Sequence, residues 1–461
     1  MMGERSVMQA ELFYEFDLER HVPTDHLIRA IDRFVDLSSI REHLRPFYSD
    51  IGRPSIDPEL MVRMLLVGYC FGIRSERRLC EEVHLNLAYR WFCRLGLDGD
   101  VPDHSTFSKN RHGRFRDSNL LRELFEMTVQ RCIAEGLVGG DGFAADASLI
   151  KADANKQRSA AAADEVDWQG LAATRRSVHE YLEVLDDAAW GAASETKPKF
   201  VSKSDPAAQW TGAMKGSAFF AYATNYLIDL KHAVIVDVEA TRAIRQAEVG
   251  AVRTMIDRVD DRFGLYPEKL AADTAYGGAE KLGWLVYERG IEPHIPVFDK
   301  SQREEGIFSR DDFVYDHGKD LYRCPAGKEL RKFHRPSLAS ARTGVHDDGF
   351  MRYRPAKADC HGCGVTDKCK PNGKDRKIMR SIYEGARDMA RDIAKTDAYV
   401  TSRRERKKVE MLFAHLKRIL KLDRLRLRGP NGARDEFLLA ATAQNLRKLA
   451  KVLPTRQPQT N

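Results

Sequence analysis

Three acidic residues have the type and spacing that a metal-dependent reaction on phosphate groups would require. Asp146 follows the apolar stretch Phe143-Ala144-Ala145, and Asp273 follows the apolar stretch Leu270-Ala271-Ala272, so we expect each near the end of a buried strand. Glu410 lies in a basic helical pattern with a predicted buried face made of Val409, Leu412, Phe413 and Leu416. Adjacent strands with this helix packed on them would bring the three carboxylates together.

Convergent carboxylates are ligands that Mg²⁺ or Mn²⁺ accepts. Two such ions about 3.5–4 Å apart can serve both the attacking and the leaving oxygen when a phosphodiester is cut. We therefore predict two ions on Asp146, Asp273 and Glu410. The alternative for each residue alone is structural, because an Asp at a strand end often caps a turn and a Glu in a basic helix often makes exposed ion pairs.

Cationic residues near Glu410 favour the functional interpretation. Arg406 and Lys417 stand four residues before and seven residues after Glu410, so all three share one helical face. Such cations could hold the phosphates of a DNA strand beside the metal ions. Arg403, one turn before Arg406, is a further candidate for DNA contact.

The elements that must position these residues change in character along the chain. Residues from about 20 to 115 read as helices: Asp57-Pro58 starts one, Ser75 starts a second that continues to Gly96, and Asp103 starts a third. The third carries the cations Lys109 and Arg111, and a helix, a turn and a basic helix are compatible with DNA binding.

Strands alternate with helices after Gly139, which predicts an α/β core with a mixed sheet. We expect five segments: a helical N-terminal DNA-binding or assembly domain at 1–138, the first part of the core at 139–299 with a polar insert at about 152–212, a cysteine-rich insert at 300–376, a helical part of the core carrying Glu410 at 377–452, and a disordered tail at 453–461.

Composition fits a soluble protein with a polyanionic partner. The 461 residues are 43% hydrophobic and 31% charged, and the net charge is +7. Residues 401–461 hold 16 Lys or Arg against 5 Asp or Glu, so the basic excess lies at this end. A basic segment indicates nucleic acid or a solvated surface helix. We find no signal peptide and no membrane span, and we expect a cytoplasmic location.

Four cysteines fall within the 300–376 insert. Four thiolates in a loop-rich cytosolic segment would suit one structural Zn²⁺, although only one C-x2-C pair is present. The alternative is that reduced thiols line a small core. The residues concerned are Cys324, Cys360, Cys363 and Cys369.

The pattern Arg406-x3-Glu410-x6-Lys417 resembles the signature around the catalytic Glu of bacterial insertion-sequence DDE transposases. That signature has a Tyr where this chain has Arg403. Longer stretches are similar as well: GRPSIDPELMVRMLLVGYCFGIRSERRLCEEVHLNLAYRWFCRLGL, ADTAYGGAEKLGWLVYERGIEPHIP and FAHLKRILKLDRLRLRGPNGARDEFLLAATAQNLRKLA.

The resemblance implies an RNase H-like catalytic fold, divalent metal ions, and movement of the element's own ends. We expect cleavage of double-stranded DNA at the terminal repeats, then attack of the freed 3′-hydroxyl on target DNA. It also implies a homo-oligomer on DNA and association with the bacterial nucleoid when bound. Two alternatives stay open: a catalytically silent, transposase-derived DNA-binding repressor, and a metal-dependent nuclease without strand transfer.

Overall fold

The computed structural model describes residues 16–49, 51–52, 55–161, 164–187, 189–190, 198–212, 216–298, 306–310, 312–333, 344–369 and 376–453. Nearly all of the expected tail at 453–461 lies outside these residues. The chain forms two compact units. The first comprises Met1–Gly139, Asp146–Tyr266 and Lys408–Asn461, and the second comprises Gly140–Ala145 and Pro267–Lys407. No helix among the described residues has the length and apolar character needed to cross a bilayer.

The first unit begins with a helical region whose expected start signals are confirmed. Asp57 caps α4 by accepting the N–H of Glu59, and Asp103 caps α7 through the N–H of Ser105. The helices are α1 (Leu18–His21), α2 (Leu27–Asp32), α3 (Ile40–Leu44), η1 (Arg45–Phe47), α4 (Pro58–Cys70), α5 (Glu76–Leu85), α6 (Leu87–Phe92), α7 (His104–Arg111), α8 (Arg114–Asp117) and α9 (Leu120–Ala134).

One helix boundary differs from the prediction. We expected a single helix from Ser75 to Gly96, but the structure ends α5 at Leu85 and starts α6 at Leu87. Asn86 causes the break, because its side chain accepts the N–H groups of Ala88 and Tyr89 and so caps a new helix.

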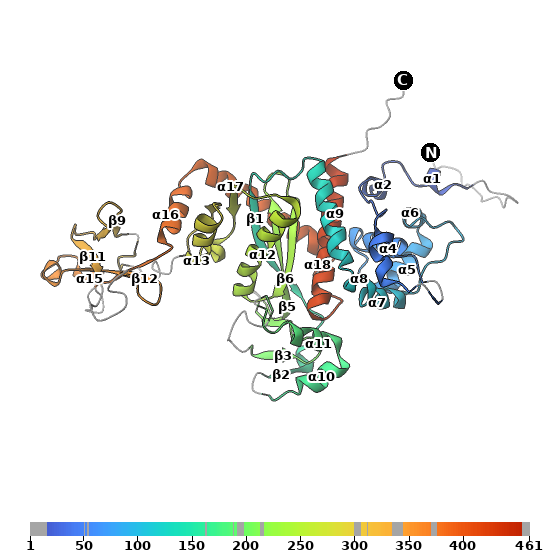
Figure 1. Ribbon diagram of the computed structural model, residues 1–461, viewed down its shortest axis with the longest axis horizontal. Helices are drawn as coiled ribbons and strands as arrows, with labels where there is room; N and C mark the ends of the chain where they lie inside the picture. Colours follow the sequence, from blue (N-terminus) through green and yellow to red (C-terminus); the bar gives the residue numbers. More distant parts are fainter. Residues whose placement is uncertain are drawn as a thin grey trace, which may run out of the picture. The chain divides into compact units, whose positions relative to one another are not determined.

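Long apolar strands form the sheet of the first unit. The strands β5 (Phe219–Asp229) and β6 (Ile235–Arg242) are antiparallel and almost wholly buried, while β4 (Gln209–Thr211) pairs with the start of β5. The helix α12 (Arg245–Phe263) packs on β5 and β6, and α18 (Gly429–Val452) packs on β6, α4, α9 and α11 (Figure 1).

The described residues of the polar insert at 152–212 form short helices and strands. It contains η2 (Lys156–Arg158), α10 (Trp168–Thr174), α11 (Arg176–Glu183) and an antiparallel pair formed by β2 (Ser159–Ala161) and β3 (Phe200–Ser202). Ring contacts hold it together, since Trp210 lies edge-on to both Phe200 and Phe220.

Strand β1 (Phe143–Lys151) contributes to both units. Its residues Phe143–Ala145 belong to the second unit, where they pair in parallel with β7 (Lys269–Ala271), and β7 pairs in parallel with β8 (Glu292–His294). Asp146 and the residues after it belong to the first unit, where β1 is hydrogen-bonded to β5. The second unit also contains η3 (Thr274–Tyr276), α13 (Ala279–Gly283), η4 (Trp284–Glu288) and α16 (Glu384–Ile393).

A separate antiparallel sheet occupies most of the expected cysteine-rich insert. Its order is β13-β12-β11-β10-β9, and its bounds are β9 (Val314–Asp316), β10 (Leu321–Arg323), β11 (Glu329–Phe333), β12 (Phe350–Pro355) and β13 (Ile378–Ser381). We expected residues from 377 onward to be helical, but β13 pairs with β12 instead. The sheet has its own core, made of Phe313, Tyr322, Leu330, Tyr353 and Ile378.

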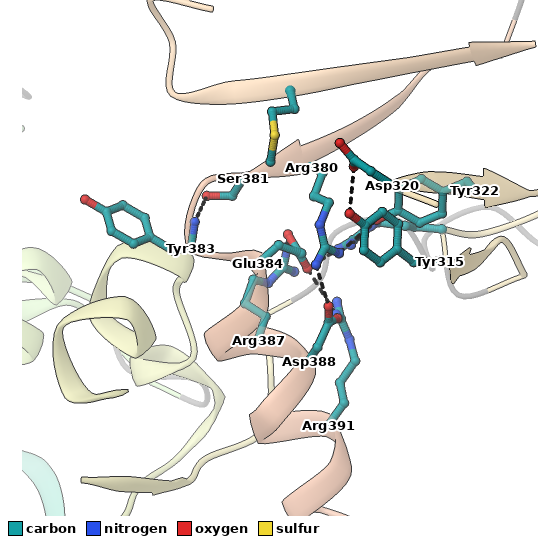
Figure 2. A network of polar contacts seen from close by, with 12 residues as sticks. Tyr315, Asp320, Tyr322, Arg380, Ser381, Tyr383, Glu384, Arg387, Asp388 and Arg391 are labelled. Carbon is teal, nitrogen blue, oxygen red and sulfur yellow. Dashed lines mark hydrogen bonds and ion pairs between the residues drawn. The ribbon is translucent and has the colours of Figure 1, made fainter. Parts of the chain in front are cut away.

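A buried polar network joins this sheet to α16 (Figure 2). Glu384 is 1% exposed and accepts hydrogen bonds from Arg310, Arg387 and Arg391. Arg380 of β13 donates to Asp388 at 2.9 Å and to the Tyr322 hydroxyl group at 3.2 Å. The pairing of each buried charge makes the junction between sheet and helix costly to disrupt.

Candidate active site

Asp146 lies on β1 directly after three fully buried residues, Phe143, Ala144 and Ala145. The Asp146 side chain is half-buried, and its Oδ1 accepts the N–H of Ala147 at 2.8 Å. Ser148 follows two positions later, so its side chain points to the same face of the strand. One face of β1 therefore carries the Asp146 carboxylate and, two residues later, the Ser148 hydroxyl group.

Asp273 lies two positions after the end of β7, in the second unit. It caps the short helix η3, and its Oδ1 accepts the N–H of Ala275 at 2.7 Å. The expected alternative of a capping Asp is thus present here, and the cap fixes the orientation of the carboxylate. One oxygen in such a cap is committed to a backbone N–H, and a carboxylate has further lone pairs for other ligands.

Glu410 is exposed on α17 (Asp397–Arg418), a helix whose residues from Lys408 onward belong to the first unit. Three of the four residues predicted for the buried face are buried, namely Val409, Phe413 and Leu416, and Leu412 is partly buried. The helix is held by stacking of Phe413 on Tyr226 of β5, with 4.9 Å between ring centroids.

Lys417 makes the contact that orients α17 on β1. Its Nζ donates to the Oγ of Ser148 at 2.8 Å, and burial lowers the pKa of the Lys417 ammonium group. Glu410, Phe413 and Lys417 are spaced three and four residues apart, so they lie on one side of the helix. The side of α17 that carries Glu410 is therefore the side that faces β1 and β5.

Further contacts give the direction of the chain after Lys417. Lys151 at the end of β1 donates its N–H to the carbonyl of Asp423, and Leu425 donates to the carbonyl of Lys151, in a parallel bridge. Because Lys417 meets Ser148 and Asp423 meets Lys151, this part of the chain advances along β1 from Ser148 toward Lys151.

The predicted DNA contacts differ in their surroundings. Lys109 and Arg403 are exposed, and Arg406 is partly buried. Arg111 is only 5% exposed and forms an ion pair with Glu76, which helps to keep the pKa of its guanidinium group high although burial opposes this. The Arg111 side chain therefore joins α7 to α5 and does not present its charge to a phosphate on the surface.

The four cysteines of the insert line one small cavity of about 20 Å³ together with Phe313 and Leu330. Burial, and then the neighbouring thiols of Cys324, Cys360 and Cys363, raise the pKa of the Cys369 thiol. Cys324 and Cys369 pack against the apolar core of the sheet, as the alternative of thiols in a small core expects. Within the described ranges, no three His, Cys, Asp or Glu side chains are arranged to hold a metal ion.

Two family models match the chain. One, described as Transposase domain (DUF772), matches residues 16–113, and another, described as Transposase DDE domain, matches residues 323–450. The protein is thus of the transposase class, which acts on DNA, and the DDE domain implies dependence on divalent metal ions. More particularly, the two matches together support an insertion-sequence DDE transposase.

The matches cover the predicted residues unevenly. Glu410, Arg406 and Lys417 lie within the second match, whereas Asp146 and Asp273 lie outside both. The sequence analysis did not include Ser148 or Tyr226, which contact α17. The alternation of residues on a strand could have identified Ser148, since it follows Asp146 by two, but nothing in the sequence links Tyr226 to Phe413.

Proposed function

We propose that this transposase cleaves DNA at the ends of its element and joins them to target DNA, with Asp146, Asp273 and Glu410 as the metal-binding catalytic residues. The observation that carries the proposal is the hydrogen bond from Lys417 to Ser148. It ties the helical face that bears Glu410 to the strand face that bears Asp146.

Contacts of β5 with β1 and with α17 support the same proposal. Ala152, just beyond β1, donates its N–H to Phe220 near the start of β5, and the two strands are neighbours in the sheet. Tyr226, six residues further along β5, stacks on Phe413 of α17. Glu410 lies one turn before Phe413 on that helix, so this contact supports its inclusion in the proposed site.

The register of β1 and β7 supports the inclusion of Asp273. Partner residues in these parallel strands are 127 positions apart, as in Phe143 with Leu270, and the two aspartates are separated by the same interval. The pairing itself covers Phe143 with Leu270 and Ala144 with Ala271, and the equal interval is what supports the inclusion of Asp273 in the proposed site. Sequence reasoning could not supply this register, because it depends on which strands pair.

Strand connectivity favours an RNase H-like core. Pairings that meet at β1 give the order β6-β5-β1-β7-β8, in which β5 and β6 are antiparallel neighbours and β1, β7 and β8 are parallel. This is the catalytic fold that the resemblance to insertion-sequence transposases implies. We propose that β1 and the segment directly after β7 supply the two aspartates and that α17 supplies the glutamate.

The donor set fits hard divalent ions. Three carboxylates offer oxygen ligands of the kind that Mg²⁺ and Mn²⁺ take. Bound as a pair, such ions would activate the attacking water or hydroxyl group and stabilise the leaving oxygen. The protein's part is to hold the carboxylates: backbone N–H groups orient Asp146 and Asp273, and the packing of Phe413 and Lys417 orients the face of Glu410.

Cations around the carboxylates would bind the DNA backbone. Arg406 and Lys417 flank Glu410 on its helix, and the exposed Arg403 and Lys109 are further contacts. The partners are the terminal repeats and the target, both double-stranded DNA. Two ends must be held together for joining, so we propose a homo-oligomer in the DNA complex.

The test is cleavage of duplex DNA carrying the sequences that flank the coding region, in Mg²⁺. Glu410→Gln should abolish cleavage and leave DNA binding intact, because the amide keeps the shape and loses the charge that binds metal. Glu405→Gln is the matched control, since Glu405 lies on the same helix about 140° around from Glu410. Cleavage by Glu410→Gln at the wild-type rate would rule out the assignment.

Strand transfer separates the proposal from its two rivals. A labelled 3′-hydroxyl end should become covalently joined to a plasmid in a reaction that needs Glu410. Cleavage without joining would identify a nuclease, and binding without either reaction would identify a silent repressor. The presence of all three carboxylates favours an active enzyme over the repressor.

We also propose one structural Zn²⁺ on Cys324, Cys360, Cys363 and Cys369, whose side chains line one cavity. Thiolates bind Zn²⁺ strongly, and metal binding would stabilise the small sheet beside them. Purified protein should contain one zinc per chain, lost in Cys360→Ser/Cys363→Ser and kept in Cys80→Ser. Metal-free wild-type protein with an unchanged unfolding midpoint would identify the cysteines as ordinary core thiols.

A further inference from the structure

A large polar cavity lies within the first unit, formed by the 152–212 insert and the segment that leads into α18. Its volume is about 950 Å³. Of the described residues that line it, only Ala154 is apolar. Its walls are built mainly from charged and polar side chains, unlike the mostly hydrophobic walls of pockets that bind drug-like ligands.

The lining is strongly cationic. It holds one carboxylate, Asp153, and six cationic side chains: Arg158, Arg175, Arg176, Lys203, Arg424 and Arg428. A concave surface with this excess of one charge sign concentrates the positive field and attracts polyanions. We name this cavity the basic groove.

Local contacts hold several of these cations in place. Arg424 and Arg428 both pair with Asp153, at 3.0 and 2.8 Å, and the Arg428 Nε also donates to the Asp153 carbonyl group. Arg175 donates to the carbonyl group of Lys203 at 2.8 Å. Fixed guanidinium groups lose little freedom when a phosphate binds, and their remaining N–H groups can donate to it.

Two other cations in the groove have no carboxylate partner among the residues that the structure describes. Arg158 ends η2, Lys203 follows β3, and both side chains are exposed. Their charges are therefore available to an external anion. Arg158 and Lys203 come from opposite ends of the insert, so the pairing of β2 with β3 brings their segments together.

We propose that the basic groove binds the phosphate backbone of the element's DNA, beside the site of cleavage. This inference rests on the proposed function, since the DNA is the enzyme's substrate. The groove begins where β1 ends: Lys151 bridges to Arg424, and Asp153 is seven residues beyond Asp146. Seven residues of extended chain span roughly 23 Å. We propose that the DNA runs along β1, so that at about 3.4 Å per base pair the groove contacts phosphates some six or seven base pairs from the cleaved bond.

Binding without metal tests the groove independently of catalysis. We would measure the affinity for duplex DNA from the element's flanking sequence, in EDTA, as a function of salt concentration. Each lost phosphate contact reduces the slope of log K against log salt by about 0.9, so Arg158→Ala/Lys203→Ala should reduce it by about 1.8. The matched control, Lys319→Ala/Lys357→Ala, removes two exposed lysines of the second unit and should keep the wild-type slope.

The position of the contact gives a second readout. Methylphosphonate substitution six or seven base pairs from the cleaved bond should weaken binding by the wild type more than it weakens binding by Arg158→Ala/Lys203→Ala. Unfolding midpoints equal to wild type show that the variant is folded. The proposal that the groove binds DNA is overturned if the salt slope is unchanged, or if both double variants lose the same amount of slope. Failure of cleavage with a confirmed slope change would instead overturn the proposed chemistry and leave the groove standing.

Discussion

Replacement of Asp205 by Asn should remove a large part of the protein's pH-dependent stability. Asp205 is completely buried beside the basic groove, where its Oδ1 accepts hydrogen bonds from the Tyr222 hydroxyl group and, at 3.3 Å, from the N–H of Gly429. Its other oxygen has no partner among the described residues. Burial raises the pKa of Asp205 to about 7, although these hydrogen bonds oppose the shift.

The sign and size of the effect follow from linkage. An unfolded Asp has a pKa near 3.8, so between pH 4 and 7 the folded state binds the proton more tightly. Stability is therefore highest in acid, falls as the pH rises toward 7, and then levels off. Three pKa units at 1.36 kcal/mol each give a total on the order of 4 kcal/mol, of which roughly 2.5 kcal/mol falls between pH 5 and 8.

The assay is urea unfolding of wild type and Asp205→Asn at pH 5 and pH 8. Asn keeps the acceptor for Tyr222 but adds a donor without a partner, which costs about 1–3 kcal/mol at every pH. The difference between the two proteins should therefore shift by roughly 2.5 kcal/mol in favour of the variant from pH 5 to 8. Parallel pH curves would refute the reasoning, and the exposed Asp186→Asn should give such parallel curves.

Two further predictions concern charged residues of α16 and α17. Glu384→Gln should destabilise the second unit by about 3–5 kcal/mol, because it removes the carboxylate that Arg310, Arg387 and Arg391 share. The exposed Asp392→Asn is the control and should be nearly neutral. Equal unfolding midpoints for the two variants would contradict this prediction. Burial alone would raise the pKa of Glu384, but the three arginines hold this pKa below its usual value. The stabilising effect of the Glu384 carboxylate should therefore be present at neutral pH. It should be lost as the pH falls through the folded-state pKa in acid. Arg406→Ala and Lys417→Ala should each flatten the salt dependence of DNA binding by about 0.9, and unchanged slopes would argue against phosphate contact at these residues.

The sequence predicted helices and strands well where residues close in sequence determine them. Asp57 and Asp103 identified helix starts, since a cap depends on residues two or three positions away. Apolar runs identified β5, β6 and the strands before both aspartates. The strand β13 was missed because its four residues, IMRS, carry too short an apolar pattern to separate strand from helix, and its pairing with β12 decides the outcome.

For the proposed site, the sequence suggested the three carboxylates but not the contacts that hold their segments in place. Glu410 could be found from its spacing to Arg406 and Lys417, which lie on the same helix. The hydrogen bond of Lys417 to Ser148 joins residues 269 positions apart, and the basic groove joins Arg158 to Arg428 across a similar distance. The sequence indicated an anion-binding surface only for the C-terminal part of the groove, because residues after position 400 include 16 basic and 5 acidic side chains.

The arrangement of Asp146, Asp273 and Glu410 can be measured directly by replacing Mg²⁺ with Fe²⁺. Fe²⁺ binds oxygen and nitrogen sites of this kind, and in the presence of ascorbate and peroxide it cuts the polypeptide next to the ligands that hold it. If the three carboxylates hold one metal site, end-labelled protein will give fragments ending near residues 146, 273 and 410, and excess Mg²⁺ will suppress all three cuts together. Cuts near one of these positions alone, or cuts that Mg²⁺ does not suppress, would contradict the shared site.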